Sequence, residues 1–325
     1  MNLPIPRLDY EEASLRYGTD KPDLRYGMEI VELGEIAENS DFQIFSGAIG
    51  RGGAVRAISV PGAAGFSRKN IDELTKIATE LGARGLAHAK YEGGELTSGI
   101  SKFFGDSEAE AYLGLLKPEE GSLILFVADK PEICAKVLGA LRVRLAERLD
   151  LADLDKWEAH FVVNFPMFEY DEETGRPVAK HHPFTQPLQE DLPLLEEDPM
   201  KVRARAYDLV LNGHEIAGGS IRIHTPELLT RVLSAIRIPE EKAREKFGFL
   251  MDAFRYGVPP HGGIAFGYDR MVMLLAGRSS IRDVIAFPKT TAGQSLMDGS
   301  PGRVDEKQLA DIGIEVLENR KEAGE

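Results

Sequence analysis

The sequence predicts an α+β fold, and three observations support this prediction. The chain has 325 residues, enough for two domains, of which 43% are hydrophobic and 28% are charged, as in globular proteins. Strand-like and helical patterns alternate between about residues 35 and 140. Farther along, apolar runs joined by turn residues, as at Asn212-Gly213, predict antiparallel strands and hairpins.

Residues 35–140 are predicted to form a compact α+β unit. The runs AVRAISV, residues 54–60, and SLILFVAD, residues 122–129, have the apolar and β-branched composition of buried strands. Ser67 is a suitable N-cap for one helix, and PEICAKVLGALRVRLAERL, residues 131–149, has the pattern of another.

Two features of this unit could suggest chemistry. The glycine-rich run SGAIGRGGA, residues 46–54, lacks the Gly-Lys-Ser/Thr ending of a phosphate-binding loop, so we expect a hairpin there. Cys134 is the single cysteine of the sequence and lies in an apolar helical run. We therefore expect a buried thiol in a reducing compartment rather than a disulfide or a metal ligand.

The stretch YDLVLNGHEIAGGSIR, residues 207–222, predicts a hairpin around Asn212-Gly213, which is a strong two-residue turn signal. The expected cross-strand pairs are Leu211 with His214, Val210 with Glu215, and Asp208 with Ala217. Asp208 and Glu215 would then lie diagonally on one face, roughly 7–8 Å apart. Two such carboxylates can share Mg²⁺, which prefers one or two carboxylates together with phosphate oxygens and water.

Arg222 lies seven residues after Glu215, so an unbroken strand would direct it to the opposite face of the hairpin. A β-bulge at Gly218-Gly219 would return Arg222 to the face of the two carboxylates. An ordinary hairpin with solvated charges is the alternative interpretation, and this segment by itself does not decide between the two.

Residues 259–277, PPHGGIAFGYDRMVMLLAG, predict a turn, a short buried strand at 263–267 and a helix that begins near Asp269. The apolar run at 271–275 predicts that this helix is largely buried. Arg270 would lie in its first turn, where the helix dipole disfavours a cation and favours an anion. An anion is therefore expected beside Arg270, either a carboxylate such as Asp269 or a phosphate of a bound nucleotide.

Adjacent histidines, His181 and His182, follow the strand-like run HFVVNFPMFEY, residues 160–170. Side chains alternate along an extended chain, so one of the two would face a given pocket. A zinc site would need further ligands, and the sequence has one cysteine and neither an HExxH nor a CxxC pattern. Recognition of an acidic substrate and simple loop structure both remain open.

Several segments together resemble the C-terminal half of a bacterial-type aspartyl-tRNA synthetase, a class II enzyme: HHPFTQP, NGHEIAGGSIRIH, REKFGFLMDAFRYGVPPHGGIAFGYDR and IRDVIAFPKT, in this order. GYDR resembles motif 3, and RYGTDKPDLR, residues 16–25, resembles the segment that follows motif 2. The resemblance implies a partial antiparallel-sheet catalytic domain made of residues 1–34 and 141–325, with a GAD-type α+β domain inserted at residues 35–140.

The resemblance also implies roles for the matching residues. The implied aspartate-binding residues are His181, His182 and Arg222. The implied Mg²⁺ ligands are Asp208 and Glu215, and the implied ATP contacts are Glu215, Gly267, Tyr268, Asp269 and Arg270. The implied catalytic residues are Arg222, Arg270 and Glu215. An arginine fork on the substrate carboxylate would select aspartate over asparagine, because the amide presents a donor to a donor.

Motif 1, motif 2 and the anticodon-binding barrel precede these segments in the family, and the sequence holds no text like them. We therefore expect an aspartate–tRNA ligase represented by its C-terminal portion, with weak or no amino-acid activation of its own. The alternatives are a truncated paralogue that binds ATP or aspartate as a regulatory module, and an asparagine-forming amide ligase. The implied partners are aspartate, ATP and, in the complete enzyme, tRNA; motif 1 would ordinarily form a homodimer.

The formal net charge of -14 opposes a free-standing nucleic-acid-binding protein, since such proteins gain affinity by neutralising phosphates. The sequence has no apolar stretch long enough to span a bilayer and no signal-peptide pattern, so a cytoplasmic location without membrane contact is expected. A polar helix is predicted after Arg303, followed by a charged, mobile end at residues 319–325.

Overall fold

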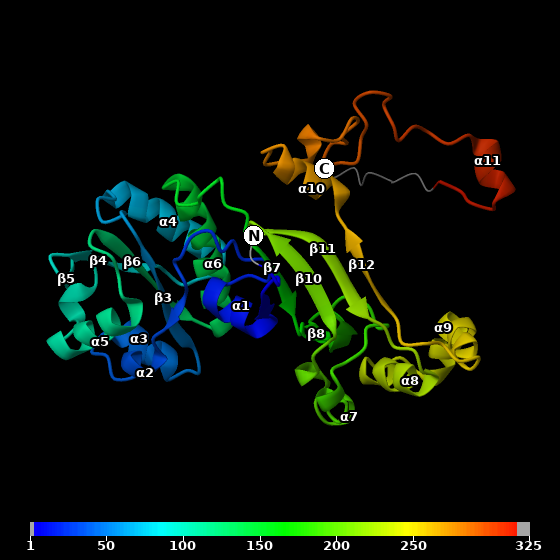
Figure 1. The fold of residues 1–325 in the computed structure, drawn as a ribbon, viewed down its shortest axis with the longest axis horizontal. Helices are drawn as coiled ribbons and strands as arrows, with labels where there is room; N and C mark the ends of the chain where they lie inside the picture. Colours follow the sequence, from blue (N-terminus) through cyan, green and yellow to red (C-terminus); the bar gives the residue numbers. More distant parts are fainter. Residues whose placement is uncertain (1–2, 317–325) are drawn as a thin grey trace, which may run out of the picture. The chain divides into compact units, whose positions relative to one another are not determined.

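The computed structural model describes residues 3–316 and divides into two compact units, Met1–Phe266 and Gly267–Glu325. The strands of the described residues form two five-stranded sheets and one two-stranded hairpin, all in the first unit (Figure 1). The predicted α+β fold is confirmed. The predicted mobile end at residues 319–325 lies outside the described residues. No helix within residues 3–316 combines the length and apolar character needed to cross a membrane.

The first sheet has the strand order β1-β7-β10-β11-β12; β1 and β7 are parallel, and the other neighbours are antiparallel. Its strands are β1 (Arg7–Asp9), β7 (Ala159–Val163), β10 (Ala206–Leu211), β11 (His214–Ile221) and β12 (Gly262–Phe266). A hydrophobic core that includes Val162 and Val210 joins this sheet to helices α1 (Tyr10–Tyr17), α8 (Pro226–Ala235) and α9 (Glu240–Phe254). The β10–β11 hairpin is therefore held inside the sheet rather than at its edge.

The second sheet has the order β2-β3-β6-β4-β5 and antiparallel neighbours. Its strands are β2 (Val31–Glu32), β3 (Ala54–Val60), β4 (Ala87–Glu92), β5 (Glu95–Thr97) and β6 (Ser122–Asp129). One hydrophobic cluster contains α4 (Arg68–Glu80) and α6 (Pro131–Arg148), and the other contains α2 (Gly34–Ala37), α3 (Gln43–Ile49) and α5 (Asp106–Leu116). The predicted strands β3 and β6 are confirmed, and both are almost fully buried because helices cover the two faces.

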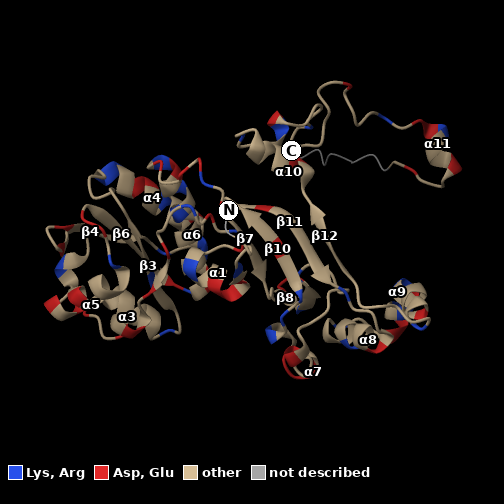
Figure 2. Cartoon of the chain, viewed as in Figure 1, with Lys and Arg blue, Asp and Glu red and all other residues tan. Residues whose placement is uncertain are grey.

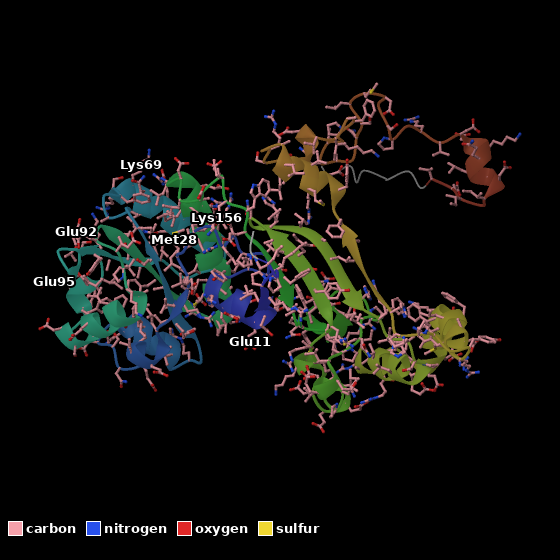
Figure 3. The ribbon with its side chains drawn as sticks, viewed as in Figure 1. Glu11, Met28, Lys69, Glu92, Glu95 and Lys156 are labelled. Carbon is pink, nitrogen blue, oxygen red and sulfur yellow. The ribbon has the colours of Figure 1, made fainter. Side chains whose placement is uncertain are left out.

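Charged side chains lie on the outside of this helix-covered sheet. Figure 3 shows Lys69 on α4 and Glu92 and Glu95 at the β4–β5 hairpin, pointing outward. Figure 2 shows acidic and basic residues interspersed along α4, and also along α9, which packs on the first sheet. Mixed charge of this kind along a helix is typical of a solvent-exposed face.

Local signals account for two further features of this region. Ser67 caps α4 as predicted, in a capping box with Asn70. Cys134 is fully buried in α6, as predicted, and burial raises the pKa of its thiol to about 11. The thiol is therefore protonated and shielded from reagents at neutral pH.

The hairpin predicted for residues 46–54 is wrong. Residues 46–49 belong to α3, and a turn at residues 50–53 leads into β3. Phe45 and Ala48, three residues apart, are both buried in the core of the second sheet. Their burial outweighs the low helix propensity of the neighbouring glycine, so tertiary packing decides the local structure.

Two predictions about the segment after residue 259 are also wrong. Strand β12 is exposed, with Ile264 42% and Phe266 55% accessible, because it pairs with β11 and forms the edge of the described sheet. Helix α10 (Tyr268–Leu275) begins at the predicted place, but of its described residues Met273 alone is buried. Within its own unit α10 packs against the short helix η4 (Ile281–Asp283), which covers little of it.

The remaining described elements are short. They are η1 (Ser101–Phe103), β8 (Phe168–Asp171), β9 (Arg176–Ala179), η2 (Gln189–Asp191), α7 (Leu194–Glu197), η3 (Pro199–Lys201) and α11 (Glu306–Asp311). The polar helix predicted after Arg303 is α11. The boundaries proposed between the catalytic and inserted domains stay a prediction.

Helices α1 and α6 meet through two glycines, Gly18 and Gly139. A Cβ atom built on Gly139 would lie 2.8 Å from the Gly18 carbonyl oxygen and 2.9 Å from that of Tyr17. Gly139→Ala is therefore expected to lower the free energy of unfolding by about 1–3 kcal/mol, as overpacking does. Gly114→Ala in α5 is the matched control, because its Cβ meets nothing within 4 Å; this variant should stabilise by roughly 0.5–1 kcal/mol. Denaturant unfolding measures both, and equal effects would contradict the packing argument.

Candidate functional site

The β10–β11 hairpin turns at Asn212-Gly213, as predicted. The φ angles of these residues are 49° and 81°, which an Asn-Gly pair tolerates in a two-residue turn. The pairs Leu211 with His214 and Val210 with Glu215 are as predicted. The Asn212 side chain fastens the turn to the chain before β7: its Oδ1 accepts from the Glu158 N–H at 2.9 Å, and its Nδ2 donates to the Lys156 carbonyl at 3.1 Å.

Beyond Val210 the register differs from the prediction. Asp208 pairs with Gly218 instead of Ala217, because Ile216 is an extra residue between the partners of Val210 and Leu209. The β-bulge thus lies at Ile216, earlier than the predicted Gly218-Gly219. A bulge at this position buries the Ile216 side chain, which is 7% exposed.

The bulge places the candidate functional side chains on one face of the hairpin. Paired residues of neighbouring strands share a face, and side chains alternate along each strand. Glu215 and Gly218 therefore lie on the face of Asp208, and the same alternation continued past the end of β11 puts Arg222 there. Because of the one extra residue, Glu215 and Arg222 lie on the same face although they are seven positions apart.

The carboxylates of Asp208 and Glu215 converge over Gly218. A Cβ atom built on Gly218 would lie 2.8 Å from Asp208 Oδ1 and 3.4 Å from Glu215 Oε1. Burial, and then the negative charge of Glu215, raise the pKa of Asp208 to about 6. A divalent cation would relieve this repulsion, so the pair fits Mg²⁺ that also takes oxygen ligands from a substrate. Within residues 3–316, three or more His, Cys, Asp or Glu side chains are nowhere grouped to hold a metal unaided.

Arg222 and His182 are in contact. Nη1 of half-buried Arg222 lies 3.1 Å from His182 Nδ1 and closer still to Nε2. Burial, and then the charge of Arg222, lower the pKa of His182, so the histidine is neutral at neutral pH. In the described part of the chain Arg222 forms no ion pair with a carboxylate. Its charge is therefore available to an acidic ligand.

The charge of an acidic residue that the sequence motifs did not indicate, Asp20, acts on His181. Its ring packs edge-on against Phe165, with ring centroids 5.4 Å apart. Burial and then the charge of Lys180 lower the pKa of His181, whereas the negative charges of Asp20 and Glu215 oppose that shift. His181 is therefore within electrostatic reach of both Glu215 and Asp20.

Asp20 and Lys21 lie in the RYGTDKPDLR segment, residues 16–25. After the larger effects of burial and Glu215, Asp20 raises the pKa of Asp208 and Lys21 lowers it. The sequence does place Asp20 next to Lys21, in a turn that contains Gly18 and Pro22. No local sequence pattern, however, connects this pair with a hairpin almost two hundred residues later. Tertiary structure makes that connection.

A cavity of 330 Å³ opens beside Arg222. Its walls are formed by Phe184, Arg222, Ile223, Leu250, Phe254, His261, Gly262 and Gly263. Mostly apolar walls with a few polar groups are typical of small-ligand sites, and the polar side chains here are the His261 imidazole and the Arg222 guanidinium, which has no carboxylate partner among the described residues. A small acidic molecule fits this combination of size and charge.

The remaining predicted ATP contacts lie at the start of α10 in the second unit. Gly267 is the N-cap residue, and Tyr268, Asp269 and Arg270 occupy the first turn. Asp269 suits the positive end of the helix dipole, and Tyr268 is 76% exposed. Whether these four residues contact ATP stays a prediction.

Comparison with known proteins gives consistent matches. The family described as tRNA synthetases class II (D, K and N) matches residues 1–291. "Aspartate--tRNA(Asp/Asn) ligase" of Geobacillus sp. (strain WCH70) is 51% identical over 322 residues, which cover 99% of this chain and 54% of that protein. "Aspartate--tRNA ligase" of Geobacillus kaustophilus (strain HTA426) is 52% identical over 315 residues, which cover 97% of this chain and 53% of that protein. The chain spans about half the length of the curated relatives it matches.

Among solved structures, an aspartyl tRNA synthetase from Entamoeba histolytica aligns with 47% of this chain and 26% of its own, at 25% sequence identity and a TM-score of 0.33. The family match extends over residues 1–291, so it contains the β10–β11 hairpin, His181 and His182, and helix α10. The chain belongs to the class II tRNA synthetases of the D, K and N group.

Proposed function

We propose that this chain carries the aspartate- and ATP-binding part of an aspartate–tRNA ligase. The observation that carries the proposal is the shared face of the β10–β11 hairpin. On it, Asp208 and Glu215 converge over Gly218, and Arg222 lies against neutral His182 beside a cavity. A cation free of internal carboxylates suits an acidic amino acid, and a carboxylate pair suits the Mg²⁺ that accompanies ATP.

The proposed reaction has two steps. An oxygen of the aspartate α-carboxylate attacks the α-phosphorus of ATP, pyrophosphate leaves, and aspartyl-adenylate forms. A terminal ribose hydroxyl of tRNA then attacks the aspartyl carbonyl carbon, and AMP leaves. Adenylate formation brings two negative groups together, so positive charge fixed in advance lowers its barrier.

Each residue has a proposed role in these steps. Arg222 pairs with the side-chain carboxylate of aspartate, and His181 and His182 line the same subsite. Asp208 and Glu215 would hold Mg²⁺, which offsets phosphate charge when bound. Gly267, Tyr268, Asp269 and Arg270 contact ATP, with Arg270 neutralising phosphate charge. Aspartate, ATP, tRNA, assembly as a homodimer and a cytoplasmic location belong to the same proposal.

Calorimetry of the 325-residue chain tests the proposal. We expect aspartate to bind in preference to asparagine, and ATP to bind in a Mg²⁺-dependent manner. We also expect aspartate-dependent ATP–pyrophosphate exchange by this 325-residue chain to be weak or undetectable, because its sequence contains no segment that resembles motif 2. Failure of both ligands to bind would refute the proposed site. Exchange as fast as that of a full-length relative would refute the expected loss of activation.

Gly218→Ala tests the carboxylate pair directly. The added Cβ would force at least one of the two carboxylates to move, because it would lie 2.8 Å from Asp208 Oδ1. We expect the Mg²⁺-dependent affinity for ATP to fall by about 10- to 100-fold, as when the support of a metal ligand is disturbed. Gly248→Ala in α9 is the matched control, since its Cβ meets nothing within 4 Å. Equal ATP affinity in the two variants would exclude Asp208 from the site.

A further inference from the structure

Arg142 is a fully buried cation at the centre of helix α6. Its guanidinium lies over the rings of Tyr17 and Tyr26, at 4.9 and 4.3 Å from their centroids. A buried charge of this kind is costly unless its donors are satisfied. The partners of Arg142 therefore indicate what the side chain is there to hold.

The hydrogen bonds of Arg142 go to the backbone of one loop, residues 18–27. Nε donates to the carbonyl of Gly27 at 3.1 Å, and Nη2 donates to those of Asp23 and Tyr26 at 2.7 and 2.9 Å. Three carbonyls of a segment without regular structure are thus fixed by one rigid, planar group. Lysine, with a single nitrogen on a flexible stem, could not reach all three in this way.

The other side of the same loop lies against the hairpin of the candidate site. A Cβ atom built on Gly213 would lie 3.1 Å from the Cβ of Asp23, so the loop touches the hairpin turn. Asp20 and Lys21 of the loop line one cavity of 1210 Å³ together with residues 212–214 and Arg142. The loop therefore connects α6 of the second sheet with the strands that carry the carboxylate pair.

We propose that Arg142 is a positioning residue for the Mg²⁺·ATP subsite, acting through residues 18–27. By fixing the carbonyls of Asp23, Tyr26 and Gly27, it holds Asp20 and Lys21 beside the hairpin and keeps the turn at Gly213 in place. Displacement of α6 would then alter the charge around Asp208 without any contact between α6 and the ligand. This inference rests on the proposed function, because Mg²⁺·ATP binding is one of its readouts.

Arg142→Lys tests the proposal, with Arg56→Lys as the matched control. Arg56 is also buried, at 7% exposed, and it binds Glu32 and the Pro131 carbonyl, so it anchors α6 without touching residues 18–27. Amide hydrogen exchange of the ligand-free chain and calorimetry with Mg²⁺·ATP are measured for both. We expect Arg142→Lys alone to speed exchange in residues 18–27 and 212–214. We also expect it to lower Mg²⁺·ATP affinity by between about two- and thirtyfold, the usual range for indirect coupling.

The proposal is overturned if both variants behave alike, or if exchange rises in residues 18–27 while Mg²⁺·ATP affinity is unchanged. If the unsubstituted chain does not bind Mg²⁺·ATP, the proposed function fails. Amide hydrogen exchange at residues 212–214 then decides the inference alone. If Arg142→Lys does not speed exchange at these residues, the inference is overturned. If Arg142→Lys does not fold, Gly139→Ala takes its place as the test variant, because the added Cβ pushes α6 away from Gly18. Gly114→Ala is then the control, and the same two measurements are made.

Discussion

Replacing His160 by leucine is expected to raise the free energy of unfolding by about 1–3 kcal/mol at pH 7 and by roughly 2–3 kcal/mol more at pH 4.5. His160 lies on β7, is 1% exposed and pairs with Val210 in the sheet. Neither of its ring nitrogens has a hydrogen-bond partner in the described part of the chain. Leucine has a similar volume and no polar atom to desolvate, so it removes a cost that histidine carries in the folded state.

The pH dependence of stability follows from the direction in which folding shifts the pKa of His160. Burial lowers the pKa of His160 to about 4, against the weaker opposing effects of Asp23 and Glu158. In the unfolded chain a histidine has a pKa of about 6.5. Below that pH the unfolded state takes up a proton that the folded state refuses, so stability is lost as pH falls from about 6.5 to 4. Above pH 6.5 both states are neutral, and this contribution disappears.

Two variants separate the titration from the unpartnered polar atoms. His160→Leu removes both, whereas His160→Gln removes the titration and keeps polar atoms in the core. Denaturant unfolding between pH 4.5 and 7.5 should show that both variants lose less stability on acidification than the unsubstituted chain. His160→Leu alone should gain stability at pH 7. If both variants lost as much unfolding free energy on acidification as the unsubstituted chain, His160 would be protonated, and therefore partnered, in the folded state.

Short-range signals in the sequence predicted the hairpin correctly, because the Asn212-Gly213 turn is selected by the backbone angles of two adjacent residues. They did not predict the bulge at Ile216, since that depends on which side chain the core accommodates. The error mattered for the site, because the position of the bulge determines which residues share a face with Asp208. Where a one-residue bulge changes the free energy of the hairpin little, tertiary packing decides the register of its strands.

The same limit applies where distant segments meet. The glycine-rich stretch before β3 became part of a helix because Phe45 and Ala48 fill a core formed by strands far along the chain. Asp20 and Lys21 belong to the family-like segment RYGTDKPDLR, but only the fold brings them to the cavity that residues 212–214 also line. Residue types and local spacing predicted which side chains could carry chemistry, and the fold decides which of them come together.

Replacing Arg222 by glutamine is expected to weaken aspartate binding by about 2–5 kcal/mol, or roughly thirtyfold to several-thousandfold, as when one partner of a buried charge pair is removed. Arg222→Lys keeps the charge but loses the planar fork, so aspartate affinity should fall less, and selection against asparagine should weaken. The reason is geometric: a fork presents two donors that only a carboxylate can satisfy, whereas a single ammonium group can also donate a hydrogen bond to an amide oxygen.

Arg205→Lys is the matched control for this series, because Arg205 is exposed and its Nη1 donates to Gln186 away from the cavity beside Arg222. Calorimetry with aspartate and asparagine gives both affinities for each variant. If Arg222→Lys kept the same ratio of the two affinities as Arg205→Lys, the fork would not be the selective element. Selection would then rest on a group other than the fork, and neutral His182, which contacts Nη1 of Arg222, is the candidate to test next.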